Sequence, residues 1–363
     1  MKRENVAKVL GGGLCALFMA FALVGCAREN DAEKSGNQNQ SITIVDMAGD
    51  EVTIDEKADE IACTWPSGTQ LFITLGMSDI LVAVPDDSKE QPWAMHMAPN
   101  VKDLPLCKNE LSVEELIKLE ADVLITTEAE VARELRKKGI CAITVNYYSV
   151  DEMKRAIGLI AEIVPTEYEE KCTAYLEYLN EQIRKVETAL AGKVNEKKTL
   201  YYIHGGNDKG LYKTAGGNTM NEAWANYAYT EFVTSDLLDS SQTNVDAEAV
   251  LAKNPEYVVI GGRYQHRLYE QLFATPEWEE IDAIKNKRVI KAPMGVSPFD
   301  RFGAEFAMMI PWLAGQVYPE HYTFDAVNEI KEFYATFSGY EMTEDEANYV
   351  INGLMPDGSR EIE

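Results

Sequence analysis

Positive charge is scarce in this sequence. Its 363 residues include 34 lysines and arginines against 60 aspartates and glutamates, for a formal net charge of −26 at pH 7. A surface of this sign repels the phosphate backbone of nucleic acids, so we do not expect a nucleic-acid partner. The HExxH, GxSxG and P-loop motifs of common enzyme classes are also missing from the sequence, and nothing in it indicates catalysis.

Cysteine and histidine are also few. Downstream of Cys26 the sequence contains Cys63, Cys107, Cys141 and Cys172, and no two of them have the CxxC spacing of a zinc or redox site. We expect these four to be small buried residues, or to include one disulfide that the sequence does not identify. Histidine, a common metal ligand, occurs only 4 times. A histidine near a predicted ligand cleft is therefore unusual enough to be a candidate metal ligand.

The N-terminus has the features of an export signal. A basic start is followed by an apolar run over residues 14–24, which is shorter than the roughly 20 residues that span a bilayer. Leu23-Val24-Gly25-Cys26 looks like a bacterial lipobox, in which the cysteine is acylated and becomes the new N-terminus. We therefore predict a lipoprotein signal peptide at residues 1–25 and a lipid anchor on Cys26, which holds the mature protein at the bacterial cell membrane, outside the cytoplasm. The alternative is a plain signal peptide with an unmodified cysteine.

Short apolar runs alternate with amphipathic helical stretches over most of the remaining chain. This alternation predicts parallel sheets with helices on their faces. Residues 26–41 are polar and too poor in apolar side chains to fold alone, so they form a flexible tether. The predicted domains are an N-terminal α/β lobe at 42–150, linking helices at 151–192, and a C-terminal α/β lobe with C-terminal helices at 193–363.

Local signals place individual elements within these lobes. Ala48-Gly49-Asp50 separates two alternating apolar runs and predicts a β-hairpin. Ser67 is a candidate helix cap, and Gly76 closes the same helix. In the linking region, a helix is predicted to run from Pro165 to Ala191.

The two lobes share an internal echo. Glu114 precedes Asp122 by eight residues, and the strand-like "VLIT" follows; Glu248 precedes Glu256 by eight residues, and "VVIG" follows. Acids in the first turn of a helix are favoured by the helix dipole, so each glutamate alone is explained as a helix-start residue. Their equivalent positions in two lobes make them a candidate pair.

Several segments in a fixed order resemble one family. They are "ITIVDMAGDEVTI", "PSGTQLFITLG", "SVEELIKLEADVLI", "AEAVLAKNPEYVVI", "TPEWEEIDAIKNKRVI" and "PMGVSPFDRFGAEFAMMIPWLAGQVYPEHY". With the lipobox, this series is similar to the substrate-binding lipoproteins of iron-complex ABC importers. These form the long-helix class of periplasmic binding proteins, which includes siderophore, haem and cobalamin binders. The resemblance implies an α/β fold of two Rossmann-like lobes, joined by a single long backbone helix, with a ligand cleft between the lobes.

The resemblance also implies partners. Family members deliver their ligand to an ABC permease dimer with its ATPase and dock through one surface glutamate per lobe, places that Glu114 (or Glu115) and Glu248 match. We expect a monomer with no permanently bound cofactor, whose ligand is a ferric siderophore or haem. The alternatives on the same scaffold are another metal complex, such as cobalamin or a nickel chelate, or an oxyanion such as molybdate or tungstate. A cell-surface enzyme is the remaining alternative.

Candidate ligand contacts in the N-terminal lobe follow strand ends, where open α/β sheets bind ligands. Trp65 lies before Pro66-Ser67. The stretch "QPWAMHMA" adds Trp93, Met95, His96 and Met97. Imidazole and thioether ligands suit haem iron or copper, so His96 is a candidate metal ligand. The alternative is that this stretch is a loop whose tryptophan and methionines pack while His96 is solvated.

Candidate contacts in the C-terminal lobe are Tyr202, Tyr264, His266 and Arg301. His266 resembles the position from which some family members supply a histidine to iron, so it is the second candidate metal ligand. The alternative is an exposed loop histidine. Arg301 is flanked by Asp300 and Glu305, and the sequence allows both a structural ion pair and a ligand clamp.

Overall fold

The computed structural model describes residues 41–108, 112–205, 210–238 and 243–360. The predicted signal peptide and Cys26 lie outside the described residues, as does the predicted tether apart from Ser41. No helix in the described ranges is both long enough and apolar enough to cross a lipid bilayer.

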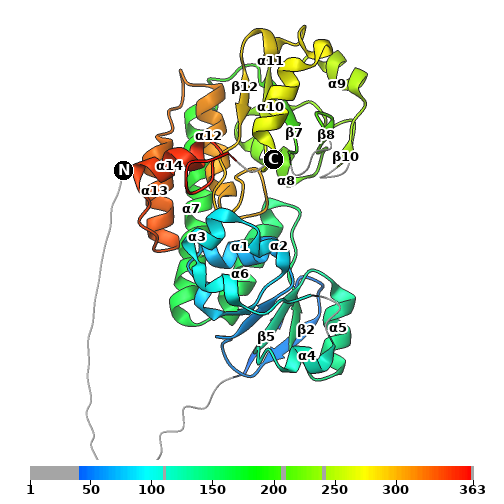
Figure 1. The fold of residues 1–363 in the computed structure, drawn as a ribbon, viewed down its shortest axis with the longest axis vertical. Helices are drawn as coiled ribbons and strands as arrows, with labels where there is room; N and C mark the ends of the chain where they lie inside the picture. Colours follow the sequence, from blue (N-terminus) through cyan, green and yellow to red (C-terminus); the bar gives the residue numbers. More distant parts are fainter. Residues whose placement is uncertain (1–40, 109–111, 206–209, 239–242, 361–363) are drawn as a thin grey trace, which may run out of the picture. The chain divides into compact units, whose positions relative to one another are not determined.

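The N-terminal lobe contains a hairpin and a parallel sheet (Figure 1). β1 (Ile42–Val45) and β2 (Glu51–Ile54) pair antiparallel, and Gly49 takes φ +84° in the turn between them, which confirms the predicted hairpin. The sheet has the order β4-β3-β5-β6. Its strands are β3 (Ile61–Cys63), β4 (Leu81–Ala83), β5 (Val123–Thr126) and β6 (Ala142–Thr144).

The C-terminal lobe repeats this topology. Its parallel sheet has the order β12-β11-β7-β9, and a short antiparallel pair, β8 and β10, lies beside it. The strands are β7 (Lys198–Ile203), β8 (Lys213–Thr214), β9 (Thr230–Phe232), β10 (Thr243–Asn244), β11 (Tyr257–Ile260) and β12 (Val289–Lys291). In each four-stranded sheet the strand that comes first in the sequence, β3 or β7, lies between the second and the third strands of that sheet. The predicted α/β architecture of parallel sheets and helices is therefore confirmed.

Helices cover both sheets. In the N-terminal lobe they are α1 (Pro66–Thr74), α2 (Asp86–Lys89), α3 (Pro92–Met97), α4 (Val113–Ile117) and α5 (Ala129–Lys137), with 3₁₀ turns η1 (Ser78–Ile80) and η2 (Pro99–Asp103). In the C-terminal lobe they are α8 (Met220–Tyr227), α9 (Ala247–Lys253), α10 (Gln265–Ala274) and α11 (Asp282–Lys285), with η3 (Pro276–Trp278). The C-terminal region adds α12 (Phe306–Val317), α13 (Ala326–Phe337) and α14 (Glu344–Ile351).

Two local predictions in this part of the chain were wrong. The stretch "QPWAMHMA" forms helix α3 and not a loop, because Pro92 occupies the first helical turn, where its missing N–H has no cost. Ser67 does not cap α1; the helix begins one residue earlier, at Pro66, and Trp65 takes the cap position without a side-chain hydrogen bond. Gly76 does follow the end of α1, with φ +65°, as expected.

The linking region consists of α6 (Val150–Ile163) and α7 (Thr166–Leu190). α7 has 25 residues and is therefore about 38 Å long. Pro165 precedes its first turn and Ala191 ends it, which confirms the predicted helix. α7 packs against α6, α8 and α12 and so contacts elements from both halves of the chain (Figure 1).

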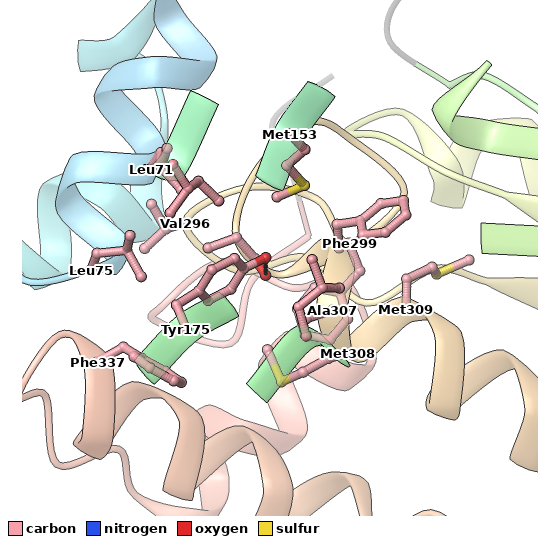
Figure 2. Packing of buried hydrophobic residues seen from close by; sticks show 14 of the residues in the cluster. Leu71, Leu75, Met153, Tyr175, Val296, Phe299, Ala307, Met308, Met309 and Phe337 are labelled. Carbon is pink, nitrogen blue, oxygen red and sulfur yellow. Dashed lines mark hydrogen bonds between the residues drawn. The ribbon is translucent and has the colours of Figure 1, made fainter. Parts of the chain in front are cut away.

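One hydrophobic core extends through both halves of the chain. Its largest cluster includes buried strand residues from each sheet, such as Ile61 and Val259. Figure 2 shows where α1, α7, α12 and α13 meet: Leu71, Tyr175 and Phe337 gather around the segment that leads from β12 into α12. Because the core is shared, this segment is fixed by both lobes.

Candidate ligand-binding site

Open α/β sheets bind ligands outside the carboxyl ends of their strands, where the strand order reverses. In these two sheets the order reverses between β3 and β5 and between β7 and β11. Trp65 follows β3 at this edge of the N-terminal lobe, and Tyr147 follows β6. In the C-terminal lobe His204 follows β7, and Arg301 lies in the segment after β12. The first and fourth strands of each parallel sheet thus direct their following residues toward one candidate site.

Three aromatic rings connect the two lobes at this edge. The ring centroids of Trp65 and Tyr147 are 5.1 Å apart, and those of Tyr147 and Phe302 are 6.2 Å apart. The Tyr147 hydroxyl donates a hydrogen bond to the Phe302 carbonyl oxygen. Tyr147 is buried, whereas Trp65 and Phe302 stay partly exposed. Trp65 and Phe302 therefore offer apolar surface to a ligand, one ring from each lobe. Our sequence reasoning missed Phe302, although it directly follows the candidate Arg301.

Arg301 belongs to a buried polar cluster. Its Nη1 donates to the Tyr202 hydroxyl at 2.8 Å and lies 3.5 Å from Asp300 Oδ2. Tyr202 in turn donates to Asp300 Oδ2 at 2.5 Å, and the Gly262 amide donates to Asp300 Oδ1 at 3.2 Å. The side chain of Asp300 is 0% exposed and that of Arg301 is 16% exposed. Arg301 is thus ion-paired, as one of the two interpretations had it, and it also reaches solvent.

His204 completes this cluster as a neutral group. Arg301 Nη2 donates to the His204 carbonyl oxygen. Burial, together with the nearby positive charges of Arg301 and Lys213, lowers the pKa of His204 to about 2. The imidazole is uncharged at physiological pH, so the charges in and near this cluster are those of Arg301, Asp300 and Lys213.

Glycines bring the backbone close to this ion pair. A Cβ atom on Gly261 would lie 2.1 Å from Asp300 Oδ2, and one on Gly262 would lie 2.6 Å from Arg301 Nη2. Gly205 has φ +46°, and a Cβ there would lie 1.8 Å from the Gly261 carbonyl oxygen. Only glycine fits at these positions. Gly205 after β7 and Gly261-Gly262 after β11 therefore mark a close approach between these two strand ends and the Asp300–Arg301 pair.

The predicted residues of "QPWAMHMA" are held by contacts within the chain. Trp93 is 1% exposed, and its indole Nε1 donates to the Leu354 carbonyl oxygen at 2.9 Å. His96 Nε2 lies 2.8 Å from the Tyr340 hydroxyl and 3.0 Å from Glu346 Oε1. The two methionines of this stretch are half-buried and pack against the core; they are Met95 and Met97.

His266 is also engaged through both ring nitrogens. Its Nε2 donates to the Gly353 carbonyl oxygen at 3.1 Å, and its Nδ1 accepts from Lys291 Nζ at 2.9 Å. Burial, with a smaller contribution from Lys291, lowers the pKa of His266. To act together as axial metal ligands through Nε2, His96 and His266 would both have to give up these hydrogen bonds. In the described ranges no group of three or more His, Cys, Asp or Glu side chains could hold a metal ion.

Tyr264 lies directly before α10, at the same edge of the C-terminal sheet. Its amide donates to the Gly205 carbonyl oxygen at 3.0 Å, so it ties the ends of β7 and β11 together. The Arg267 guanidinium lies 5.1 Å from the centre of its half-buried ring. Tyr264 is therefore placed beside the Arg301 cluster by its backbone.

The two predicted docking glutamates occupy equivalent places. Ser112 caps α4 and Asp246 caps α9 with their side chains, and Glu114 and Glu248 each stand two residues after the cap. Both glutamates are exposed. The Glu115 carboxylate, by contrast, accepts hydrogen bonds from the amide and the hydroxyl of Ser112 and completes a capping box. The carboxylates of Glu114 and Glu248 therefore take no part in capping α4 and α9, although the Glu248 amide donates to the capping Asp246.

The second acid of each echo has a structural role. Asp122 Oδ2 accepts hydrogen bonds from the amides of Asp59 and Glu60, both at 3.0 Å, just before β3. Glu256 accepts from the Thr199 amide at 3.2 Å and pairs with Lys198 at 2.8 Å, at the start of β7. Asp122 thus holds the amino end of β3, and Glu256 holds the amino end of β7. The sequence echo reflects a repeated structural unit.

A buried carboxyl group holds the segment that carries Arg301. Glu305 is 0% exposed. Its Oε1 accepts from the Ser297 amide at 3.0 Å, the Tyr334 hydroxyl at 2.9 Å and the Thr74 hydroxyl at 3.4 Å. Its Oε2 has no partner among the described residues. Burial raises the pKa of Glu305 to about 7, well above its ordinary value of 4.5.

This shift predicts a pH-dependent stability. The folded chain binds the Glu305 proton more tightly than the unfolded chain, so the free energy of unfolding falls as pH rises from 4.5 toward 7. A rise in pKa of this size corresponds to roughly 3 kcal/mol. Urea denaturation of Glu305→Gln should lack this loss, and above pH 7 the variant should be more stable than the natural chain. Glu332→Gln, at an exposed position of α13, is the control. Parallel pH profiles for the natural chain and Glu305→Gln would contradict the prediction.

A cavity of about 680 Å³ lies away from this site. It is lined by β2, by the end of α4 with Ile117, by Asp122 just before β5, and by Cys141 just before β6. Asp122 and Cys141 precede their strands, so this cavity lies at the amino ends of the N-terminal sheet. The expected ligand edge is the opposite one, where Trp65 lies.

A family model described as periplasmic binding protein matches residues 61–294, which include both parallel sheets. The chain belongs to this family. As a periplasmic binding protein it is a solute-binding protein and not an enzyme, in agreement with the missing catalytic motifs.

Individual relatives agree with this assignment. An uncharacterized ABC transporter substrate-binding lipoprotein of Bacillus subtilis, YvrC, is 23% identical over 315 residues, which cover 84% of this chain and 95% of YvrC. MolA of Haemophilus influenzae, a periplasmic binding protein solved with molybdate, superposes with a TM-score of 0.71 at 19% identity, over 83% of this chain and 99% of that one. CeuE of Helicobacter pylori, solved as a Ni–His complex, superposes with a TM-score of 0.68 at 18% identity, over 85% and 98%. At such identities the two structures establish the shared fold.

Proposed function

We propose that the chain is an extracytoplasmic, lipid-anchored solute-binding protein that captures an iron chelate, a ferric siderophore or haem, and delivers it to an ABC permease. The observation that carries this proposal is the combination of Arg301 with the rings of Trp65 and Phe302, at the edge where both sheets end. The name of the Bacillus relative supports the transporter assignment and the lipid anchor.

The chemistry of this edge suits an anionic organic chelate. Siderophores and haem supply most of the ligands of the iron themselves, so the protein need only recognise their organic surface and their charge. The partly exposed rings of Trp65 and Phe302 offer apolar contacts, and the Arg301 guanidinium suits a carboxylate or another planar anionic group. CeuE shows that a related fold is compatible with a metal complex.

An oxyanion is the second candidate ligand. α1 begins at the ligand edge without a side-chain cap, and the N–H groups of an uncapped helix start attract anions. MolA, which shares the fold, was solved with molybdate. If the ligand is an oxyanion, the rings of Trp65, Tyr147 and Phe302 have no role in binding it.

The ligand assignment is tested by titrating residues 27–363 with haemin, a ferric catecholate siderophore and molybdate, followed by calorimetry and tryptophan fluorescence. We expect one of the two iron chelates to bind with micromolar or better affinity and to quench fluorescence, because Trp65 lies at the site. We expect no heat from molybdate. Binding of molybdate alone would replace the iron-chelate assignment with the oxyanion one.

Membrane attachment should depend on Cys26. Changing Cys26→Ser removes the thiol that the lipobox presents for acylation, so the chain should be released from membranes or remain unprocessed. Detergent-phase partition of the natural and variant proteins measures this. Cys15→Ser, inside the apolar run of the signal, is the matched control and should leave partition unchanged. Continued partition of a cleaved Cys26→Ser chain with the detergent phase would contradict the anchor; an uncleaved chain still carries the apolar run at residues 14–24 and is distinguished by its mass.

A further inference from the structure

Two successive carbonyl groups near the C-terminus are bonded to opposite lobes. The Gly353 carbonyl oxygen accepts from His266 Nε2 at 3.1 Å, on α10 of the C-terminal lobe. The next carbonyl, of Leu354, accepts from Trp93 Nε1 at 2.9 Å, on α3 of the N-terminal lobe. A single peptide unit thus separates the contacts that the chain makes with its two lobes.

The contact with the N-terminal lobe is extensive. Trp93 and His96 are three residues apart on α3, so they share one face of the helix. While Trp93 bonds to Leu354, His96 Nε2 lies 2.8 Å from the Tyr340 hydroxyl and 3.0 Å from Glu346 Oε1. Tyr340 itself donates to Glu346 Oε1 at 2.6 Å. One face of α3 therefore holds both α14 and the segment that follows it.

The contact with the C-terminal lobe is equally specific. The Met294 amide, after β12, donates to the Val350 carbonyl oxygen at 2.9 Å. Lys291, on β12, donates to His266 Nδ1 and so fixes the imidazole with its Nε2 hydrogen directed at Gly353. Gly353 has φ +63°, and a Cβ there would lie 2.2 Å from Gln265 Nε2. Glycine is therefore required where the chain turns from one lobe to the other.

The position of these contacts relates them to solute binding. α3 follows β4 and α10 follows β11, so both helices start from the carboxyl edges of their sheets. This is the edge that holds Trp65 and Arg301. A connection between α3 and α10 consequently sets how far apart the two halves of the ligand site stand.

We propose that residues 350–355 are an inter-lobe brace, and that Trp93 and His266 are positioning residues that act through it on the solute site. The brace adds a connection between the lobes to those made by α7, by the Tyr147–Phe302 contact and by the shared core. With all of these in place the lobes stand at a nearly fixed separation before any solute arrives. In this role the indole and the imidazole act as hydrogen-bond donors to the main chain and need no metal.

Spin-label distance measurements test the brace without any solute. One label is placed on each lobe, at Glu130→Cys and Glu280→Cys, whose side chains are 83% and 87% exposed, in a Cys141→Ser background. In the natural sequence we expect a narrow inter-lobe distance distribution. In the Trp93→Phe/His266→Phe variant, which keeps an aromatic ring at each position but loses both donors, the distribution should broaden and shift by several ångström.

A matched control separates the brace from a general loss of packing. Trp278 is 0% exposed, and its Nε1 donates to the Tyr212 hydroxyl at 3.0 Å within the C-terminal lobe. Trp278→Phe therefore also removes a buried indole donor and should leave the inter-lobe distribution narrow. Gly353→Ala, which strains the turn between the two carbonyls, should broaden it.

The outcomes decide the proposal. Broadening in the double variant and in Gly353→Ala, but not in Trp278→Phe, supports the brace. An unchanged distribution in the double variant, with the protein still folded by circular dichroism, overturns it. If the double variant does not fold, the Gly353→Ala distribution decides alone. Since no solute is present, neither result bears on the cargo proposed above.

Discussion

Reversing both Glu114 and Glu248 to arginine is expected to abolish solute uptake while solute affinity in solution changes by no more than about twofold. The two exposed glutamates stand at equivalent places, two residues after a capping side chain, one in each lobe. Two like charges on a rigid body suit a permease dimer that carries arginines. Losing both contacts removes the avidity as well as the orientation of docking.

Uptake in a host strain that lacks the natural gene product measures this effect. The matched control is Glu130→Arg/Glu280→Arg, which makes the same charge change at one exposed acid in each lobe, away from these helix starts. We expect the control to transport normally. Unchanged uptake with the Glu114/Glu248 variant would remove these residues from docking, and equal losses in both variants would point to bulk charge.

Changing Arg301→Met should weaken binding of an anionic iron chelate by roughly 2 to 5 kcal/mol, the cost typical of removing one partner of a buried, hydrogen-bonded charge pair. The same change leaves the buried Asp300 carboxylate without its counter-charge, so it should also destabilise the fold. Calorimetric titration and urea denaturation report the two effects separately.

A double variant distinguishes a ligand contact from a structural ion pair. In Asp300→Asn/Arg301→Met both charges are removed. The Gly262 amide can still donate to the remaining side-chain oxygen at position 300, and the Tyr202 hydroxyl can accept from the side-chain NH2 group in place of donating to Oδ2. Stability should recover toward that of the natural chain, whereas chelate binding should stay weak. Recovery of both would mean that Arg301 only balances Asp300 and does not contact the solute.

Most of the fold could be predicted because its signals are local. The hairpin around Gly49, the helix between Pro165 and Ala191, and the alternation of strands and helices all follow from side-chain periodicity and turn residues. The echo of Glu114–Asp122 in Glu248–Glu256 corresponds to a repeated cap, helix and strand in the structure. A signal that recurs in two lobes is stronger than either copy alone.

The roles of single side chains were harder to predict because they depend on distant parts of the chain. The partners of Trp93 and His96 lie roughly 250 residues further along, in the C-terminal region. Nothing in the sequence near "QPWAMHMA" indicates that the Trp93 indole would be buried and would donate a hydrogen bond to the Leu354 carbonyl oxygen. A histidine between two methionines is equally compatible with metal binding and with packing until those partners are known.

The burial of Glu305 was also beyond sequence reasoning. Acids next to arginines are usually exposed, and its three hydrogen-bond donors come from α1, the segment after β12, and α13. The Arg301 environment was only half predicted, for a related reason. Its neighbour Asp300 was visible in the sequence, but Tyr202 and the glycines meet it only when the two strand ends are brought together.

Native mass spectrometry with metal analysis of the mature protein, purified from its own host under iron limitation, tests the central claim most directly. The account predicts a bound species with the mass of a single organic chelate and one iron per protein, which is lost or strongly depleted in Asp300→Asn/Arg301→Met. A bound molybdate or tungstate, or a bare metal ion without an organic ligand, would contradict it.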